Sequence, residues 1–445
     1  MSMSLAQRWL LLTLLTTLTA AGCAYVSHGG MARQLAAVIA LTLILGGLLA
    51  WLALDKTFDG LRARHALTTV IALGVIALPA LPLLEDDHFR YLWDGYITAT
   101  TGKPFAYAPS HYFDNAAAPA AMREVLSGIN NPDVPTIYGP ALQALFALCY
   151  WVAPGELWPF KVLLLGTQIA VLLLLRASGV SWRWLMLLLL HPLIYKESAI
   201  TAHPDLLIGA ALLAAVLAWQ RGHEGWAASL ACVAVAMKFS ALAVLPFFCI
   251  TRGGRWSARG SMAGAITLAA LYAPTLFTMS GAEGRALAVF GEQWTFNPLL
   301  FKLAAAALGD ATARWLVAAV FVLAWLTLAA RWLARLRQGA LMPPPVVAAL
   351  VTMLLLSPVV NPWYWLWVLP LATLRFSALA WIVASVSLLA YAHVGTQVLA
   401  GSSIVTYAVP LWATALQLLA LFIAVARMPR SAGLHAGSIG TKKVI

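Results

Sequence analysis

Three consecutive acidic residues, Glu85, Asp86 and Asp87, directly follow the apolar stretch 66–84. Ionised carboxylates at the end of a hydrophobic helix are costly unless water or a substrate meets them. An ionised Asp there can act as a general base when a substrate hydroxyl comes within hydrogen-bond distance. Two adjacent carboxylates can also orient an acceptor or hold a divalent cation through oxygen ligands. A solvated helix end is the plain structural alternative, and the spacing is compatible with both.

Polar and aromatic residues continue from these carboxylates at helical spacing. Arg90 lies one helical turn after the two aspartates and can pair with either of them on a helix face. Tyr91, Trp93, Asp94 and Tyr96 follow. A substrate-binding helix is one interpretation of this pattern. An interfacial helix with an aromatic belt explains the aromatic residues equally well.

Two further groups of polar residues lie where apolar sequence begins. Tyr138 belongs to the sequence PTIYGP, in which Pro and Gly can also serve only to turn the chain into a helix. His203 and Asp205 open another apolar segment, where Asp205 can simply meet the positive end of the helix dipole. Lys196 and Glu197 lie just before them and can pair with each other.

Lys238 interrupts the apolar run 227–250. A charge at membrane depth is a functional candidate by default, and a lysine there could bind a lipid phosphate. The alternative is that its ammonium snorkels to the surface. Asn361 and Tyr364 break another apolar stretch, where they could hydrogen-bond to a sugar or belong to an aromatic belt. His393 lies within an apolar segment and is better explained as a core or interface histidine.

The composition decides the class of protein. The chain has 445 residues, of which 62% are hydrophobic and 10% are charged, whereas a soluble domain has about 25% charged residues. The formal net charge of +12 does not indicate nucleic-acid binding, because Lys and Arg are scattered between apolar segments. The four cysteines lie in apolar segments without metal-ligand spacing, which disfavours disulfides and a cysteine metal site.

The apolar runs are continuous, which favours helices, since a backbone in lipid must satisfy its polar groups internally. We therefore expect an all-α polytopic membrane protein with about 12 to 14 transmembrane helices of roughly 20 residues. The short stretch 139–153 is expected to be a membrane-embedded or surface helix, and the segments around Lys238 and Pro362 to be broken helices. The predicted spans are 5–26, 35–54, 66–84, 158–176, 183–197, 203–219, 225–237, 239–250, 261–279, 313–330, 346–360, 363–374, 377–398 and 405–426.

The distribution of charge predicts the orientation. With the N-terminus in the cytoplasm, most of the 28 Lys and Arg residues fall on the cytoplasmic side, together with only three acidic residues, Asp55, Asp59 and Glu224. This arrangement follows the positive-inside rule, and it gathers the candidate chemical residues on the opposite face. Cys23 follows small residues as at a lipoprotein cleavage site, but the usual Leu three positions earlier is missing, so the first helix is expected to stay uncleaved.

Two stretches resemble the first extracytoplasmic loop of GT-C glycosyltransferases, namely EDDHFRYLWDGYITATTGKPFAYAP (85–109) and INNPDVPTIYGPALQALFAL (129–148). They most resemble the bacterial polyprenyl-phosphate-hexose-dependent mannosyltransferase-like members. Later segments follow in the family's order: a His-x-Asp element, a Lys segment with a later Pro, and an Asn-Pro-Trp-Tyr element. No Walker loop, dinucleotide-binding glycine pattern, zinc motif or nucleophile elbow competes with this interpretation.

The resemblance implies an integral-membrane inverting transferase that uses a lipid-phosphate sugar donor. Asp86 corresponds to the catalytic base, and Asp87 is its neighbour. The chain departs from the family pattern at Asn131, Gly139 and Asn361, which leaves the sugar and the acceptor open, and its N-terminal helices are additional to those of the simplest members. The implied substrate-binding residues are Arg90, Tyr91, Tyr138, His203, Asp205, Lys238, Asn361 and Tyr364.

The expected activity is transfer of a hexose, with mannose the expected one, from a polyprenyl-phosphate donor to a lipid-linked or cell-envelope glycan. A transporter or flippase of lipid-linked sugars and a lipid-glycan ligase or polymerase are the alternatives. The expected partners are donor, acceptor and membrane lipid, without nucleic acid. No particular cofactor is predicted, and the need for a divalent cation stays open. The expected place is the bacterial inner membrane, with both termini cytoplasmic and the site extracytoplasmic. The expected parts are N-terminal helices (1–84), a catalytic loop (85–157), a transmembrane core (158–430) and a cytoplasmic tail (431–445).

Overall fold

The computed structural model describes residues 3–114, 117–276, 288–289, 291–400 and 408–426. This part of the chain is helical, and its β-structure is confined to isolated bridges at Ile250–Trp256 and Phe296–Val359. The predicted all-α class is therefore confirmed. The predicted tail 431–445 lies outside the described residues.

Five helical segments are long and apolar enough to cross a membrane, and a sixth span results if one bent pair of helices is counted as a single span. The chain is therefore a multi-pass membrane protein. The predicted number of 12 to 14 spans stays a prediction, because several predicted spans are shorter helices. The long segments are α1 (Leu5–Val26), α2 (Met31–Leu54), α7 (Trp158–Ala177), α15 (Asp310–Arg337) and Ala378–Val398, and the bent pair is η3 (Ile194–Ile200) with α9 (Asp205–Gln220).

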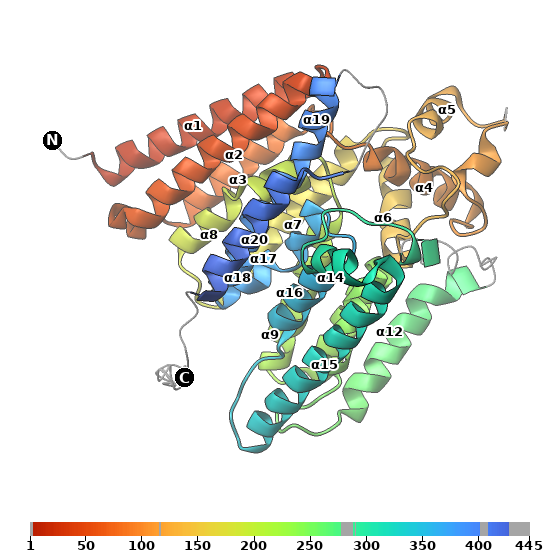
Figure 1. Cartoon of the computed structure of the whole chain (residues 1–445). Coiled ribbons are helices and arrows are strands. Elements are labelled where there is room, and N and C mark those ends of the chain that lie inside the picture. The colour runs from red at the N-terminus through yellow and green to blue at the C-terminus, as the bar shows by residue number, and fades with distance from the viewer. Residues whose placement is uncertain (1–2, 115–116, 277–287, 290, 401–407, 427–445) are drawn as a thin grey trace.

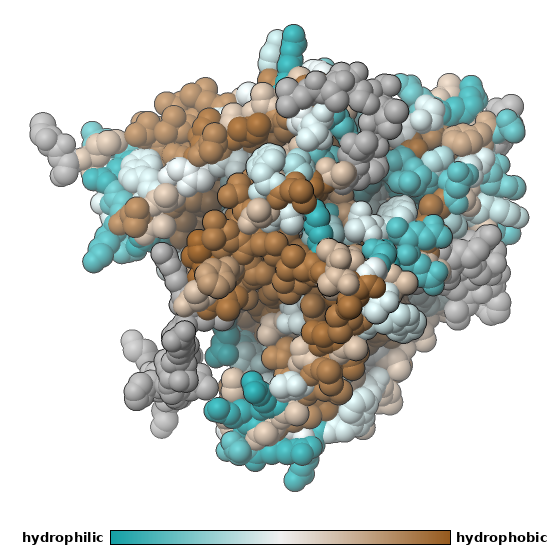
Figure 2. Space-filling view, viewed as in Figure 1, coloured by the Kyte–Doolittle hydropathy of each residue, from teal (hydrophilic) through white to brown (hydrophobic). Residues whose placement is uncertain are grey.

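Shorter helices complete the bundle and pack between the long ones (Figure 1). A broad apolar surface covers the helices, and polar residues gather at their ends, as Figure 2 shows for one face. An outward apolar surface between polar ends is what a bilayer requires of such a bundle. The shorter elements are α3 (Ala63–Ala77), α8 (Trp182–Leu189), α10 (Glu224–Met237), α12 (Ala258–Leu276), α14 (Leu300–Leu308), α16 (Val346–Leu356), α17 (Leu369–Leu374) and α20 (Leu411–Ala426). The long segment Ala378–Val398 comprises α18 (Ala378–Val386), η6 (Ser387–Tyr391) and most of α19 (Ala392–Ala400).

The predicted helix 66–84 ends early. The corresponding helix α3 ends at Ala77, because Pro79 and Pro82 follow and cannot supply the backbone N–H groups that a helix needs. Residues 78–86, which we call the linker, therefore run without regular helix to the start of α4. The acidic residues thus end an irregular segment, and the prediction that a hydrophobic helix runs directly up to them is wrong.

The described part of the loop predicted at 85–157 contains a short 3-10 helix, η2 (Pro109–Tyr112), and three α-helices. The three α-helices are α4 (Asp87–Thr101), α5 (Ala120–Ser127) and α6 (Pro140–Val152), which lie together at one end of the bundle (Figure 1). We call these the outer cap. Gly95 lets α4 approach α6 closely, since a Cβ there would lie 2.6 Å from the carbonyl oxygen of Phe146. Gly139 similarly meets the end of α10, where a Cβ would lie 2.2 Å from the carbonyl oxygen of Ala236.

Two breaks in the bundle bring polar residues to the outer cap. Helix α10 ends at Met237, and Lys238 adopts an extended backbone conformation (φ −150°, ψ 123°) before the short helices η4 (Phe239–Ala243) and α11 (Leu245–Phe248). The second break follows α16, after which the short helix η5 (Pro362–Trp367) packs against α9. Both segments were predicted to be broken helices, and the structure confirms it.

Candidate active site

A cavity of about 700 Å³ opens where the linker, the outer cap, the start of α2, the two breaks and α19 meet. Seven of the ten predicted site residues line it. The other three, Tyr91, His203 and Asp205, are buried behind its wall and contact residues that line it. The seven are Asp86, Asp87, Arg90, Tyr138, Lys238, Asn361 and Tyr364.

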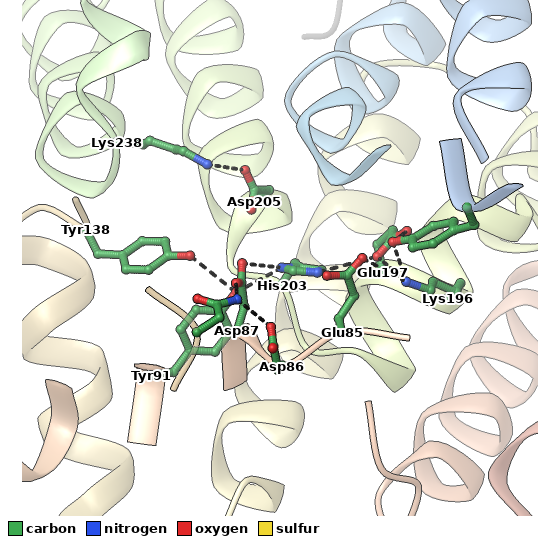
Figure 3. Close-up of polar contacts among 12 residues, drawn as sticks. Glu85, Asp86, Asp87, Tyr91, Tyr138, Lys196, Glu197, His203, Asp205 and Lys238 are labelled. Atoms are coloured by element: carbon green, nitrogen blue, oxygen red, sulfur yellow. Dashed lines mark hydrogen bonds and ion pairs between the residues drawn. The ribbon is translucent and has the colours of Figure 1, made fainter. Parts of the chain in front are cut away.

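Asp86 and Asp87 lie at the N-terminal end of α4 and share one hydrogen-bond donor (Figure 3). The side-chain amide of Asn130 donates to Asp86 Oδ1 and, at 3.2 Å, to Asp87 Oδ1. Burial, followed by the neighbouring charge of Asp87, raises the pKa of Asp86 to about 6, while the Asn130 hydrogen bond opposes this rise. Burial also raises the pKa of Asp87, and the Asn130 hydrogen bond and then the charge of Lys238 oppose it.

Glu85 points away from the two aspartates toward a buried cluster in the bundle (Figure 3). Its Oε1 lies 4.0 Å from Lys196 Nζ, and Lys196 pairs with Glu197 at 3.1 Å as predicted. Tyr391 completes this cluster, because its hydroxyl donates to Glu197 Oε1 at 2.8 Å and accepts from Lys196. Burial raises the pKa of Glu85 well above its usual range, against the opposing charge of Lys196. Glu85 is therefore less suited to act as a base.

His203 lies between this buried cluster and the aspartates. Its Nδ1 is 2.9 Å from the Tyr91 hydroxyl and 4.0 Å from Asp87 Oδ2. Its Nε2 is 3.6 Å from Glu197 Oε2, and its ring stacks on Trp363 at 3.8 Å between centroids. These contacts fix the ring behind the cavity wall, where it supports Tyr91 and Trp363 rather than meeting a substrate directly.

Lys238 is held inside the protein at the edge of the cavity. Its Nζ lies 3.2 Å from Asp205 Oδ1, which also accepts from Trp367 Nε1 at 2.6 Å. The same ammonium lies 4.0 Å from the centre of the Tyr364 ring, within the range of a cation–π interaction. The side chain is thus paired internally and only 8% exposed, which argues against snorkelling to the surface.

Arg90 does not form the predicted ion pair with an aspartate one turn earlier. Among the described residues, no carboxylate lies within ion-pair distance of its guanidinium. Asp87 instead contacts Asn130, and Arg90 Nη2 donates to the carbonyl oxygen of Asn131 at 3.2 Å. Arg90 Nη1 is buried and has no hydrogen-bond partner in the described part of the chain. A buried guanidinium N–H on a cavity wall suits an anionic or carbonyl oxygen of a substrate.

Asp94 organises the outer cap. It accepts hydrogen bonds from Thr136 Oγ1 at 2.6 Å and from Gln143 Nε2 at 2.9 Å. These bonds tie α4 to the turn before α6 and hold Tyr138, whose hydroxyl lies 3.5 Å from that of Tyr91. The sequence singles out Thr136 only as part of the PTIYGP turn, and it does not single out Gln143, which lies three residues after that turn.

No group of three or more His, Cys, Asp or Glu side chains in the described residues has a geometry that could hold a metal ion. The acidic residues diverge, since Glu85 turns to Lys196 while the two aspartates share Asn130.

A model of the MptA_B family, described as the N-terminal domain of alpha-(1->6)-mannopyranosyltransferase, matches residues 4–253. The chain belongs to this family. Its membership confirms the resemblance to GT-C mannosyltransferases and makes the protein a glycosyltransferase. Comparisons with curated proteins and with solved structures gave no match.

The extent of the match bears on individual predictions. It begins at residue 4, so the N-terminal helices, which were expected to be additional to those of the simplest members, belong to the family's pattern. It includes the linker, the outer cap and Lys238. Asn361 and Tyr364 lie beyond it, and their inclusion in the site rests on the cavity that they line.

Proposed function

We propose that the protein is an inverting mannosyltransferase that moves mannose from a polyprenyl-phosphate donor to a lipid-linked or cell-envelope glycan at the extracytoplasmic face. The observation that carries this proposal is a single cavity lined by two aspartates and by buried cations, in a membrane protein of this family. The cavity is large enough for a sugar with its phosphate, since ligand pockets have volumes of about 300–1,000 Å³.

In the proposed reaction, Asp86 is the general base. A pKa of about 6 leaves this carboxylate mostly ionised at pH 7, yet close enough to neutrality to accept a proton efficiently. The acceptor hydroxyl oxygen attacks the anomeric carbon and its proton passes to Asp86, while the bond from that carbon to the phosphate oxygen breaks. The electron pair leaves with the polyprenyl phosphate. Asp87 is the alternative base and would otherwise orient the acceptor.

The phosphate of the donor is proposed to meet Lys238 and Arg90. The ammonium of Lys238 has three N–H donors and pairs with Asp205 through one of them. Arg90 offers the unpartnered Nη1. Cations fixed in a low-dielectric site stabilise the charge that develops on the leaving phosphate. A phosphate is already a good leaving group, so no general acid is needed.

The sugar is proposed to lie against the aromatic wall of the cavity. Asn361 and Tyr138 supply hydrogen-bonding groups there, and Trp363 and Tyr364 supply ring faces. Tyr91, His203 and Asp205 would act from behind by holding these residues and Lys238. This assignment makes the latter three positioning residues, although the sequence suggested direct substrate contacts.

The stereochemistry provides the test. A single in-line displacement inverts the anomeric carbon, so an α-(1→6) product, as in the family's name, requires a β-linked donor. We expect purified protein in vesicles to add mannose from β-linked polyprenyl-phosphomannose and not from the α-linked form. Equal use of both anomers would contradict the mechanism, and absence of transfer from every lipid-phosphate sugar tested would contradict the function.

The same assay separates the alternatives. A transporter or flippase moves lipid-linked sugar without forming a new glycosidic bond, so a product of higher mass excludes it. A ligase or polymerase transfers a preassembled glycan, whereas the proposed enzyme adds a single hexose. Family membership supports the transferase over the transporter.

A further inference from the structure

Gln34, near the start of α2, connects the turn between the first two helices to the acidic end of the linker. Its Nε2 donates to the carbonyl oxygens of Ser27 (2.9 Å) and Gly29 (3.0 Å). Its Oε1 accepts from the backbone N–H of Leu84 at 2.9 Å. Leu84 immediately precedes Glu85. One side chain therefore ties the acidic residues to a helical hairpin that lies far away in the sequence.

Leu84 has a backbone conformation that needs such support. Its φ of +62° lies in the left-handed region, which lowers the population of a residue that has a Cβ by about 5- to 30-fold relative to the right-handed one. Conformations of this kind persist only where the surrounding structure holds them, and they cluster at functional sites. The Gln34 hydrogen bond acts directly on the N–H of the strained residue.

The same turn holds the linker at two further points. Ser27 Oγ accepts from the backbone N–H of Leu81 at 2.8 Å, and His28 Nε2 lies 3.1 Å from the carbonyl oxygen of Pro79. The linker has no helix of its own to satisfy these backbone groups. Gln34 also lines the cavity. The hairpin of α1 and α2 is thus part of the framework of the site.

We propose that Gln34 is a positioning residue for the catalytic base. By holding Leu84 in the left-handed conformation, it sets the direction in which the linker enters α4, and therefore where the Asp86 carboxylate meets the acceptor hydroxyl. All hydrogen bonds described for its side chain go to backbone groups, so its effect on Asp86 passes through the linker. This inference rests on the function proposed above.

The first test is rescue by glycine. Gln34→Ala is expected to lower kcat by about 10- to 100-fold, the cost of misplacing a reacting group by about 1 Å. The KM for the donor should change less than kcat, because Lys238 is held by other elements and Arg90 is also held by its hydrogen bond to the carbonyl oxygen of Asn131. Adding Leu84→Gly should recover kcat by about 5- to 30-fold, because glycine adopts positive φ without cost. Leu84→Ala is the matched control, since it removes the same side-chain atoms except the Cβ. It should give no recovery of kcat.

Two results would overturn the inference in this assay. One is that Leu84→Gly and Leu84→Ala change kcat equally in the Gln34→Ala background. The other is a kcat for Gln34→Ala that equals that of the parent protein. The midpoint of thermal unfolding, measured for each variant, shows whether the variants being compared are folded.

The second test does not depend on activity. Gln34→Ala removes the acceptor of the Leu84 N–H, so hydrogen–deuterium exchange should increase in a peptide covering residues 79–88. Exchange in residues 158–177 of α7 should stay the same. Unchanged exchange in 79–88 overturns the inference whatever the activity is. If exchange in residues 79–88 increases but the parent protein transfers no sugar, the proposed function is rejected. The result would still establish that Gln34 holds the linker.

Discussion

Replacing Asn130 by Ala removes the one donor that Asp86 and Asp87 share. That hydrogen bond favours the ionised carboxylate and so lowers the pKa of Asp86. Its loss must therefore raise this pKa above its value of about 6. A hydrogen bond to a charged group contributes about 1.5–3 kcal/mol, and one pKa unit corresponds to about 1.4 kcal/mol. The expected rise is about one to two units.

This rise predicts a specific change in the pH profile. With a pKa of about 6, roughly nine-tenths of Asp86 is ionised at pH 7. After the change, the ionised fraction falls to between about a half and a tenth. Transfer at pH 7 should therefore fall by about 2- to 10-fold and recover as the pH is raised toward 9. The acid limb of kcat/KM should move to higher pH by the same one to two units.

The assay is sugar transfer by purified Asn130→Ala protein between pH 5 and 9. Ser127→Ala is a suitable control, because Ser127 lies nearby at the end of α5 and its hydroxyl donates only to the carbonyl oxygen of Glu124 among its described bonds. The control should keep the parental profile. The reasoning would be refuted if the acid limb of kcat/KM in the Asn130→Ala variant stayed in place or moved to lower pH. Asp86 and Asp87 titrate together and lose the donor that they share, so the acid limb reports the change in the pair.

Three further predictions follow from the geometry. Lys238→Gln should raise the KM for the donor by at least about 10-fold while membrane insertion persists, and kinetics that stay parental would remove Lys238 from the phosphate site. Gly139→Ala should lower the stability of the protein by about 1–3 kcal/mol, seen in its thermal midpoint, because the Cβ would lie 2.2 Å from a backbone oxygen. Lys103 lies at an exposed position just after α4. Lys103→Cys should react in intact cells with a maleimide that does not cross the membrane, whereas protection until lysis would reverse the proposed orientation.

Many of the residues that line the cavity could be predicted from the sequence because they interrupt apolar segments. Lys238 and Asn361 stand out for that reason, and each lies at a break in a helix that opens onto the cavity. The acidic residues stand out by their charge. In a membrane protein, polar residues are rare enough that their positions alone indicate where the chemistry lies.

Residues that support the site could not be predicted in the same way. Gln34 and Tyr391 are ordinary residues of apolar helices, and their partners, Leu84 and Glu197, are far away in the sequence. Nothing in local spacing indicates such contacts. Asn130 belongs to the stretch 129–148 that resembles the family, but its contacts depend on the path of the chain between α5 and α6, which local patterns do not determine.

The sequence contains a signal for the early end of α3, but the hydropathy of residues 66–84 conceals it. Pro79 and Pro82 are poor residues for the last turns of a helix, yet the apolar character continues through them. A segment can be apolar because it is buried and not because it is helical, and the linker is an example, with Leu83 fully buried. Proline positions were a better guide to this boundary than hydropathy.

The most direct test of the central claim compares Asp86→Asn with Asp87→Asn in the transfer assay. Both changes keep the size of the side chain, and both variants should insert and fold as the parent does. We expect Asp86→Asn to lower kcat by about 10²- to 10⁴-fold, the usual contribution of a general base, without a matching loss of donor binding. Transfer by Asp86→Asn at close to the parental rate would contradict the assignment of the base, and parental rates in both variants would contradict the account of the cavity as the active site.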